Sequence, residues 1–295
     1  MNYAYYPGCS LTGSAEEYDI ATRAVLKSLS LPVTEILDWT CCGASAVEPV
    51  SHLLSYALPA RNLALAEDQV PKADVLVPCS ACYLNLLKAG EGMRRDPALH
   101  RKINTALAVE ALAVKNVPKV RHLLDVLAND ITPEAITGKV VRPVAGLSIA
   151  PYYGCQILRP FVRFDDPENP SVMNRIIEAL GAEVFPWSWG NRCCGASLMA
   201  THRETALQAV AALLREAQGA DAVVTVCPMC QMNLEAYQRE ARRFGAPADE
   251  ITILYLPQLM GLAFGLPEDQ VRMNKNILVT RGFKEKILSV QTVAA

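Results

Sequence analysis

A duplicated pattern of cysteines constrains this 295-residue chain more than any other feature of its sequence. The stretch Cys41-Cys42-Gly43-Ala44-Ser45 returns as Cys193-Cys194-Gly195-Ala196-Ser197. In each copy a Gly-Cys pair lies upstream of the Cys-Cys pair, and a C-x-x-C motif lies downstream of it. The ten cysteines thus form two sets of five, namely Cys9, Cys41, Cys42, Cys79 and Cys82, then Cys155, Cys193, Cys194, Cys227 and Cys230. Two sets in the same order indicate an internal repeat.

The offset between the two sets varies little along the chain. Corresponding cysteines are 146 positions apart at the Gly-Cys pair, 152 at the Cys-Cys pair and 148 at the C-x-x-C motif. A nearly constant offset favours a duplicated unit with small differences in its loops. We therefore expect two domains, residues 1–140 and 141–295, with the stretch 129–143 as the linker because it contains Pro, Gly and Thr.

Short apolar segments typical of strands alternate with segments of helical periodicity in both halves. The expected strands are residues 2–6, 33–37, 74–77 and 120–124, then 147–152, 183–185, 221–226 and 251–256. This alternation predicts an α/β fold with parallel sheets. Each cysteine group directly follows an expected strand, and functional groups gather at the carboxyl ends of parallel strands. The thiols of each half should therefore converge on one edge of a sheet.

Local signals predict where several helices begin, end or bend. Ser14 and Thr201 each precede a glutamate by three residues, which is the spacing of a capping box. Asn169 is expected to cap a helix that has Pro170 in its first turn. Pro59 is expected to break or kink a helix over residues 50–70, because proline removes a backbone donor.

Composition and charge exclude several classes of function. The net charge is −2 and no basic run occurs, so we expect no nucleic-acid partner. We find neither a secretory signal nor an apolar stretch long enough for a membrane span, and we expect a cytoplasmic protein. Reduced thiols in the cytosol favour metal or redox sites over structural disulfides, and vicinal cysteines pair poorly. The hydrophobic content of 51% favours contact with other subunits.

Five thiols in each half bear on the metal that each half could hold. Structural zinc takes four ligands, commonly from two C-x-x-C motifs, and each half has only one such motif. An ordinary four-iron cubane also needs only four cysteines. A vicinal pair rarely places both sulfurs on one small ion, whereas a larger body can accept them on different irons. The spacing therefore favours a large iron–sulfur cluster in each half, with zinc as the alternative.

The motifs around these cysteines resemble a known family. They include Tyr6-Pro-Gly-Cys9, Pro78-Cys79-Ser-Ala-Cys82-Tyr-Leu-Asn, Tyr153-Gly-Cys155 with Pro160, Asn169-Pro170 and Cys227-Pro-Met-Cys230-Gln-Met-Asn, besides the two Cys-Cys-Gly-Ala stretches. The pattern resembles the cysteine-rich CCG domain, and two complete copies resemble the B-type subunit of heterodisulfide reductase. The resemblance implies two homologous Rossmann-like CCG domains with parallel sheets, related by pseudo-twofold duplication.

The resemblance also implies a cofactor and an activity. Each set of five cysteines would ligate one noncubane [4Fe-4S] cluster, and Gly43 and Gly195 would let the backbone approach it with positive φ. Enzymes of this family reduce a small disulfide lodged between the two clusters. Their electrons come from two other chains of the same complex, one ferredoxin-like (C-type) and one flavin-containing (A-type). The ten cysteines would thus act catalytically through the clusters.

Two other functions remain open. One is an iron–sulfur electron-transfer subunit of a lactate, glycerol-3-phosphate or succinate dehydrogenase-type complex, several of which fuse the CCG domain to a ferredoxin module that is absent here. The other is a zinc or redox-sensing module. Arg159, Arg163 and Arg192 could bind an anionic substrate, although solvated or capping roles are favoured for them. His122 is a weaker candidate for proton donation, with ordinary packing favoured, and the tryptophans beside the Cys-Cys pairs could shield a cluster.

Overall fold

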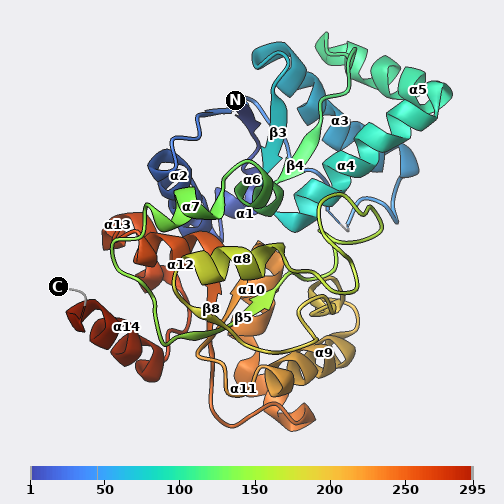
Figure 1. The fold of residues 1–295 in the computed structure, drawn as a ribbon. Helices are drawn as coiled ribbons and strands as arrows, with labels where there is room; N and C mark the ends of the chain where they lie inside the picture. The colour runs from blue at the N-terminus through green and yellow to red at the C-terminus, as the bar shows by residue number, and fades with distance from the viewer. Residues whose placement is uncertain (1, 45, 294–295) are drawn as a thin grey trace. The chain divides into compact units, whose positions relative to one another are not determined.

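The computed structural model describes residues 2–44 and 46–293, without the side chains of 290–293. Ser45, in the first Cys-Cys-Gly motif, lies outside the described residues. The strands form two separate four-stranded sheets, and every strand pair in them is parallel (Figure 1). This arrangement confirms the α/β fold with duplicated parallel sheets that the alternation of segments predicts.

The two sheets have the same strand order relative to the chain. The first contains β1 (Tyr3–Tyr5), β2 (Val33–Glu35), β3 (Asp74–Val77) and β4 (Val120–His122) in the order β2-β1-β3-β4. The second contains β5 (Ser148–Tyr152), β6 (Glu183–Val184), β7 (Ala222–Thr225) and β8 (Thr252–Tyr255) in the order β6-β5-β7-β8. The order is Rossmann-like, because successive strands are added first on one side of the leading strand and then on the other.

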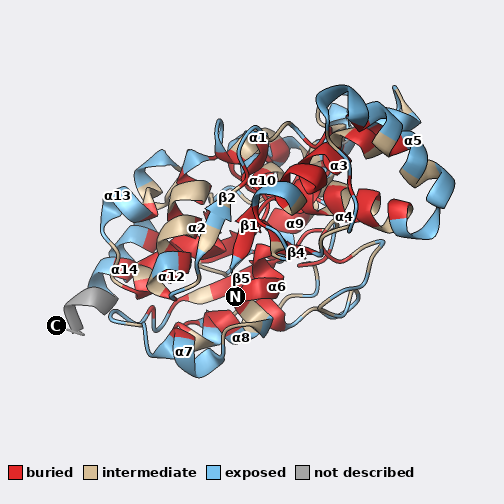
Figure 2. Cartoon of the chain, turned by 90° about the horizontal axis from the view of Figure 1, so that it is seen from above, coloured by how far each residue is buried: buried red, intermediate tan, exposed pale blue. Residues whose placement is uncertain are grey.

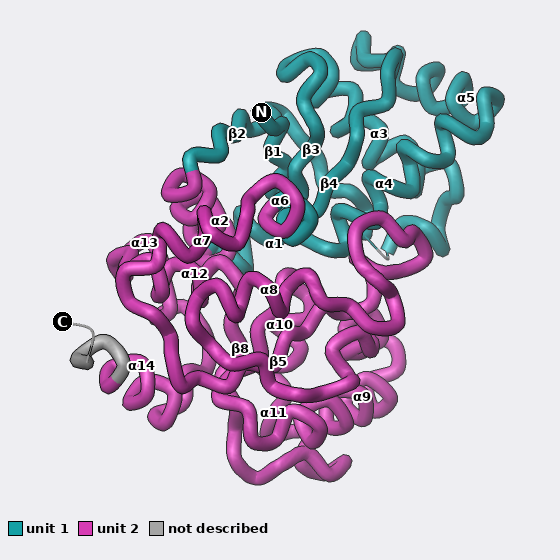
Figure 3. Tube along the Cα trace, viewed as in Figure 1, with its two compact units in different colours: residues 1–16, 30–126 teal, residues 17–29, 127–295 magenta. Residues whose placement is uncertain are grey.

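Contacts between residues divide the chain into two compact units (Figure 3). Unit 1 comprises residues 1–16 and 30–126, and unit 2 comprises 17–29 and 127–295. The units follow the sequence repeat except that one helix of the first repeat belongs to unit 2. That helix is α2 (Glu16–Ser28), of which all but the first residue lies in unit 2.

In unit 1 the helices pack on the sheet and on one another. They are α1 (Gly8–Leu11), α3 (His52–Gln69), α4 (Ser80–Arg95), α5 (Pro97–Leu107) and the start of α6 (Leu123–Asn129), with a 3₁₀ turn at Ala108–Glu110. Helix α4 packs against β3, β4, α3 and α5. It follows β3 directly, so the C-x-x-C motif between them is fixed by a buried strand and a buried helix.

Unit 2 contains the remaining helices. They are α7 (Pro133–Thr137), α8 (Val172–Ala179), α9 (Arg203–Glu216), α10 (Pro228–Ala236), α11 (Gln238–Ala241), α12 (Leu256–Ala263), α13 (Glu268–Val271) and α14 (Arg281–Val293). Three 3₁₀ turns lie at Ala196–Leu198, Arg242–Phe244 and Met273–Lys275. Helix α8 packs on β5 and β6, α10 on β8, and α12 on β7 and β8.

Both sheets are buried, as parallel sheets covered by helices require. All residues of β1, β7 and β8 are buried, and β1 is drawn as buried in Figure 2. The edge strands β2 and β6 are more exposed. The strand positions predicted from the sequence are confirmed, with some ends one or two residues shorter than expected.

The predicted helix caps are wrong at three positions. Helix α8 begins at Val172 with Ser171 as its N-cap rather than Asn169. Helix α9 has His202 as its N-cap without a side-chain bond, and α2 begins at Glu16, beyond Ser14. At α8, the backbone N–H groups of Ser171 and Val172 are bonded to the carboxylate of Asp165. A side chain supplied by the preceding loop thus replaces the local cap that the sequence suggested.

The expected break at Pro59 is also wrong, because α3 is a continuous helix of 18 residues across it. Proline inside a helix costs about 3 kcal/mol. The residues from Pro59 to Ala66 are all buried. Their burial offsets the missing hydrogen bond, since each fully buried aliphatic side chain contributes roughly 2 kcal/mol.

Candidate functional site

In unit 1 the five thiols come from three neighbouring segments. Cys9 lies on α1 directly after β1, and Cys41 and Cys42 lie in the loop after β2. Cys79 is the N-cap of α4, and Cys82 lies in the first turn of that helix. Because β2, β1 and β3 are adjacent in the sheet and parallel, the three segments leave it at the same edge.

The sulfurs of this first set contact one another. Cys9 Sγ lies 3.7 Å from Cys41 Sγ, and Cys42 Sγ lies 3.3 Å from Cys82 Sγ. Cys82 also forms a side-chain hydrogen bond with Cys79. Cys9 and Cys41 are exposed, whereas the other three are buried. The set therefore has an outer part open to solvent and an inner part in the core of unit 1.

Unit 2 repeats this arrangement. Cys155 follows β5, the pair Cys193-Cys194 follows β6, and Cys227 and Cys230 lie at the start of α10 after β7. Cys194 Sγ lies 3.7 Å from Cys230 Sγ. Cys193 is exposed and Cys155 is half-buried, while the other three are buried. All ten cysteines lie in the described part of the chain, and each is a free thiol.

Thiols in contact share their protons unequally. Hydrogen bonds from Cys41 and Cys82 lower the pKa of Cys42 to about 3. In unit 2, a hydrogen bond from Cys155 lowers the pKa of Cys193 to about 6, and the same bond raises the pKa of Cys155. One sulfur in each unit is thus favoured as a thiolate, which is the form that binds metals.

Glycine leaves room beside the inner sulfurs. Gly8 has φ +72°, and a Cβ atom there would lie 2.9 Å from Cys82 Sγ. At the equivalent position Gly154 has φ +69°, and its Cβ would lie 3.2 Å from Cys230 Sγ. A side chain at either position would occupy space against a sulfur. Both glycines thus open a cradle on the thiol side of their unit.

Gly43 and Gly195 have the positive φ values expected for them, +81° and +78°. Their N–H groups donate to sulfurs of the preceding pair, Gly43 to Cys41 Sγ at 3.4 Å and Gly195 to Cys193 Sγ at 3.3 Å. An added Cβ at Gly195 would lie 2.9 Å from Ala206 Cα. Both glycines therefore shape the loop and hydrogen-bond a sulfur, and their role toward a cofactor stays a prediction.

The donor set fits a thiolate-bound iron–sulfur cluster in each unit. In each unit the thiols lie at one sheet edge and some contact one another in pairs, no carboxylate is interleaved in the motifs, and the glycine cradle leaves space against the inner sulfurs. Within residues 2–44 and 46–293, no group of three or more His, Cys, Asp or Glu side chains is arranged to hold a single metal ion. The sulfurs instead contact one another in pairs, such as Cys42 with Cys82 and Cys194 with Cys230.

Four polar side chains near the thiols, three of them buried and Asn85 half-buried, were not predicted from the sequence. Each unit has a tyrosine and an asparagine bonded to backbone carbonyls around its Cys-Cys pair: Tyr6 and Asn85 in unit 1, Tyr152 and Asn233 in unit 2. The available signal was their equal spacing in the two repeats. Each tyrosine lies three residues before the lone cysteine, and each asparagine three residues after the last one.

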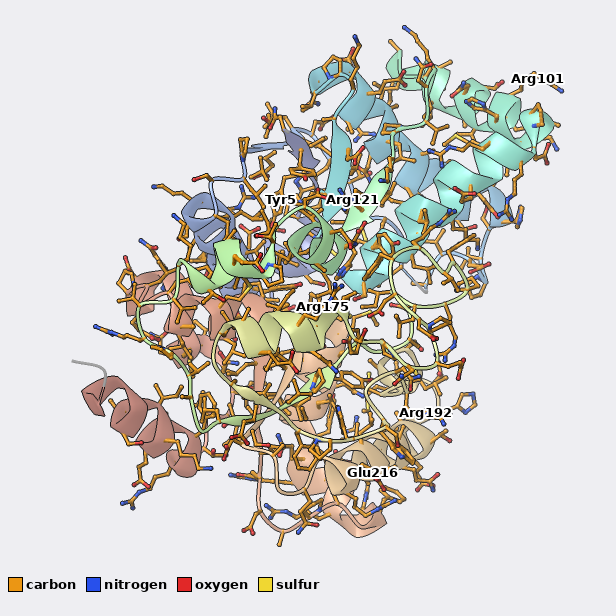
Figure 4. All side chains as sticks on the ribbon, in the orientation of Figure 1. Tyr5, Arg101, Arg121, Arg175, Arg192 and Glu216 are labelled. Carbon is orange, nitrogen blue, oxygen red and sulfur yellow. The ribbon has the colours of Figure 1, made fainter. Side chains whose placement is uncertain are left out.

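The arginines have local partners in unit 2. Arg159 donates to Glu168 Oε1 at 2.6 Å and to the carbonyl oxygens of Pro167 and Asn191. The exposed Arg192, labelled in Figure 4, stacks over the ring of Trp189, with its Cζ atom 5.9 Å from the ring centroid. These contacts agree with the structural roles favoured from the sequence. Arg163 lies over the ring of Phe161 at 5.8 Å.

His122 is fully buried at the end of β4. Its Nδ1 accepts from the N–H of Leu124 at 3.1 Å, and its Nε2 lies 3.4 Å from Ser80 Oγ. Its ring also meets Tyr83 edge-on, with 5.4 Å between centroids. These contacts fix the imidazole between β4 and the start of α4, which agrees with the packing role favoured from the sequence.

Tryptophans lie beside the same tyrosines that approach the thiols. Trp39 meets Tyr6 edge-on, with ring centroids 5.6 Å apart. Trp187 lies 6.2 Å from Tyr152, and its Nε1 donates to the carbonyl of Pro151 at 3.1 Å. Trp187 and Trp189 also pack against the core cluster that contains Cys194, Cys227 and Cys230.

The fold and the two thiol sets together define a class of protein: a duplicated, thiol-rich α/β protein with its sulfurs at the carboxyl ends of parallel strands. A family model for the cysteine-rich domain called CCG matches residues 3–87 and 149–235. The chain belongs to this family and carries two copies of its domain.

Curated relatives extend over nearly the whole chain. The 8-methylmenaquinol:fumarate reductase membrane anchor subunit of Wolinella succinogenes is 35% identical, covering 94% of this chain and 96% of the relative. A protein of Archaeoglobus profundus, named as similar to the B-type subunit of heterodisulfide reductase, is 28% identical over 92% of this chain and 93% of the relative. The B-type subunit of the ferredoxin/F420H2-dependent CoB-CoM heterodisulfide reductase of Methanosarcina acetivorans is 26% identical, with coverage of 97% and 96%. The resemblance to the B-type subunit of heterodisulfide reductase is confirmed.

A solved structure shares the fold. The crystal structure of a hypothetical protein from Helicobacter pylori superimposes with a TM-score of 0.73 at 16% identity. The match covers 95% of this chain and 52% of the other, so the chain spans about half the length of that protein. Among the described residues, no helix has the length and apolar character needed to cross a membrane.

Proposed function

We propose that this chain is the iron–sulfur subunit of an oxidoreductase complex of the heterodisulfide reductase kind, and that it acts on a small disulfide or the corresponding thiols. The observation that carries the proposal is the presence of two complete five-thiol sets, one in each compact unit. The proposed ligands are Cys9, Cys41, Cys42, Cys79 and Cys82 for one noncubane [4Fe-4S] cluster, and Cys155, Cys193, Cys194, Cys227 and Cys230 for the other. When bound, such clusters would supply single electrons.

The chemistry requires two electrons and two protons for each disulfide that is cleaved into two thiols. Two one-electron centres match that demand, and the relatives named as heterodisulfide reductase subunits support it. The exposed outer sulfurs Cys9, Cys41 and Cys193 support access for a small substrate. The electrons would come from two partner chains, one ferredoxin-like (C-type) and one flavin-containing (A-type), in a cytoplasmic complex.

A second candidate is an iron–sulfur electron-transfer subunit of a succinate dehydrogenase- or fumarate reductase-type complex. The observation that favours it is the 35% identity to the fumarate reductase subunit of Wolinella succinogenes. In this function the chain would pass electrons to or from a partner without a disulfide substrate. The two candidates share the cofactors and differ in the acceptor.

The proposal can be tested on anaerobically purified protein with its native partner subunits. We expect about eight irons per chain, from two four-iron clusters, together with acid-labile sulfide. Turnover is measured with a reduced viologen dye and three acceptors, namely coenzyme M–coenzyme B disulfide, glutathione disulfide and fumarate. Replacing Cys42 or Cys194 by Ala should abolish turnover of the disulfide that the wild type accepts.

The outcomes separate the candidates. Iron with fumarate turnover and no disulfide turnover supports the second candidate. Zinc without sulfide contradicts both. Unchanged disulfide turnover in either Cys→Ala variant contradicts a role for both units in the reaction.

A further inference from the structure

Each Cys-Cys pair is held at both ends by polar side chains, which are buried except for the half-buried Asn85. The residue before the pair offers its carbonyl oxygen to a tyrosine hydroxyl, and the second cysteine of the pair offers its carbonyl oxygen to an asparagine amide. The tyrosine hydroxyls of Tyr6 and Tyr152 donate to Thr40 O at 2.7 Å and to Arg192 O at 2.8 Å. The amides of Asn85 and Asn233 donate to Cys42 O at 3.1 Å and to Cys194 O at 2.7 Å.

These bonds recur at equal spacing in both units. Tyr6 and Tyr152 precede the lone cysteine by three residues and are both 0% exposed. Burial, together with the neighbouring thiols, raises the pKa of both hydroxyls, so they remain protonated donors at any ordinary pH. Repetition at the same positions is not expected from accidental packing.

Fixing both carbonyls fixes the direction of the two sulfurs between them. Peptide planes are rigid, so a dipeptide held at each end keeps little freedom in its φ and ψ angles. In both units the first sulfur of the pair is exposed and the second is buried: Cys41 and Cys193 face outward, and Cys42 and Cys194 face inward. Vicinal sulfurs that diverge in this way can reach different atoms of one large ligand, but not one small ion.

We propose that the two tyrosines and the two asparagines are positioning residues of the thiol sites. They clamp each Cys-Cys pair in its divergent arrangement before any metal is bound. That this arrangement receives an iron–sulfur cluster rests on the proposed function, whereas the clamp is a property of the chain itself. The four residues, here called the carbonyl clamp, are Tyr6, Asn85, Tyr152 and Asn233.

The clamp is stronger in unit 1 than in unit 2. Asn62 on α3 donates to Thr40 O at 2.9 Å and accepts from Thr40 N at 2.8 Å, so this residue is held by two side chains. Among the described residues, Arg192 O receives a side-chain hydrogen bond from Tyr152 alone. Loss of the tyrosine hydroxyl should therefore release the pair of unit 2 more than the pair of unit 1.

The test in unit 2 uses two adjacent buried tyrosines. Tyr153 is 1% exposed and accepts a bond from Met173 N at the start of α8, away from the Cys-Cys pair. Y152F removes a clamp bond, and Y153F removes two hydrogen bonds elsewhere in the unit, those of the Tyr153 hydroxyl with Met173 N and Asn174 Oδ1. In the metal-free full-length chain, iodoacetamide should alkylate Cys194 about fivefold faster in Y152F than in wild type, the size of one lost hydrogen bond. The rate in Y153F should match the wild type.

Mass spectrometry of the alkylated peptides gives the rates for Cys193 and Cys194 separately. Equal acceleration in Y152F and Y153F would show general loosening of unit 2 and overturn the proposal. No acceleration in either variant would also overturn it. If Y152F does not fold, N233A takes its place, since it removes the other clamp bond and is read by the same alkylation of Cys194.

Unit 1 provides the matched comparison. Y6F alone should accelerate alkylation of Cys42 less than Y152F accelerates that of Cys194, because Asn62 still holds Thr40. The double variant Y6F/N62A should remove this difference. If Y6F accelerates alkylation of Cys42 as much as Y152F accelerates that of Cys194, Asn62 does not help to hold Thr40.

A readout on loaded protein separates this inference from the proposed function. In anaerobically reconstituted protein, Y152F should change the electron paramagnetic resonance signal of the reduced centres and speed iron release to a chelator, while Y153F should do neither. Wild-type protein that binds no iron would contradict the proposed function and leave the alkylation test intact. Iron-loaded protein in which both variants behave as wild type would contradict the clamp alone.

Discussion

At the scale of single residues, the thiol sites depend on space as much as on sulfur. The inner sulfurs of the two units lie against glycines, because any Cβ at Gly8 or Gly154 would contact Cys82 or Cys230. The Cys-x-x-Cys and Cys-Cys motifs make the proposed ligands recognisable in the sequence. The space beside them is visible only in the folded chain.

The glycine cradle gives a prediction with an internal control. Gly154→Ala introduces both a positive-φ strain of about 1 kcal/mol and a contact at 3.2 Å with Cys230 Sγ. Gly146→Ala introduces the strain alone, since φ there is +74° and no atom lies within 4 Å of the added Cβ. We expect both variants to lose similar thermal stability, and only Gly154→Ala to lose iron from unit 2. Iron analysis and calorimetry measure these effects, and equal iron contents would contradict the cradle.

Glu235 predicts a dependence of stability on pH. Its carboxyl is buried, accepts from Leu278 N at 3.0 Å, and has a pKa that burial raises above the ordinary value of 4.5. The folded state then binds more protons at this carboxyl than the unfolded state, so the contribution of Glu235 to the free energy of unfolding is largest below pH 4.5 and is lost as pH rises through the folded-state pKa.

Glu235→Gln removes this titration and keeps an oxygen for the Leu278 bond. The decline of the melting temperature above pH 4.5 should be smaller than in wild type. Glu216→Gln, at an exposed glutamate of α9 labelled in Figure 4, serves as the control and should follow the wild type. Parallel melting curves for all three proteins across this range would contradict the assignment.

At the scale of elements, α2 shows how far packing departs from the sequence repeat. The helix comes from the first repeat, yet nearly all of it belongs to unit 2. The Tyr18 ring stacks on Tyr255 with 4.1 Å between centroids and 2° between planes, and its hydroxyl donates to Val226 O at 3.1 Å. Val226 directly precedes Cys227, so α2 helps to fix the strand end that carries the second C-x-x-C motif.

Substitutions at Tyr18 separate these two contacts. Tyr18→Phe keeps the stacking and should cost about 1 kcal/mol for the lost hydrogen bond. Tyr18→Leu removes both and should cost about 3 kcal/mol, with faster amide hydrogen exchange in α2 and β7. Arg23→Ala, which removes a solvent-accessible i,i+4 ion pair with Asp19, should cost about 0.5 kcal/mol. Denaturant unfolding measures the three values, and a Leu variant no worse than the Arg23 variant would contradict the role of Tyr18.

At the scale of the whole molecule, metal and fold should be coupled. Ten thiols at the strand ends bind metal only when the loops are folded, so bound clusters stabilise the folded chain. Removing iron anaerobically with a chelator should lower the melting temperature by at least about 5 °C. A Cys42→Ala/Cys194→Ala variant, with both sets interrupted, should show a much smaller chelator effect. Equal shifts in the two proteins would contradict stabilisation through these sites.

The repeat, the strands and the common sheet edge of each cysteine set could be predicted from the sequence. These features follow from local information: apolar periodicity places the strands, and parallel strands bring their carboxyl ends to one edge. The strand positions and the Cys-Cys-Gly and C-x-x-C motifs could therefore be predicted, as could the positive φ of Gly43 and Gly195.

How those elements are capped, kept continuous and packed depends on contacts between segments far apart in the chain. Asp165 caps α8 in place of Asn169, burial keeps α3 continuous across Pro59, and α2 packs in unit 2. The carbonyl clamp likewise joins residues 34 to 43 positions apart, such as Tyr6 with Thr40 and Asn85 with Cys42. Such bonds form because burial leaves a carbonyl without water, and the donor that satisfies it is whichever side chain the fold brings near. No pattern among sequence neighbours encodes that choice.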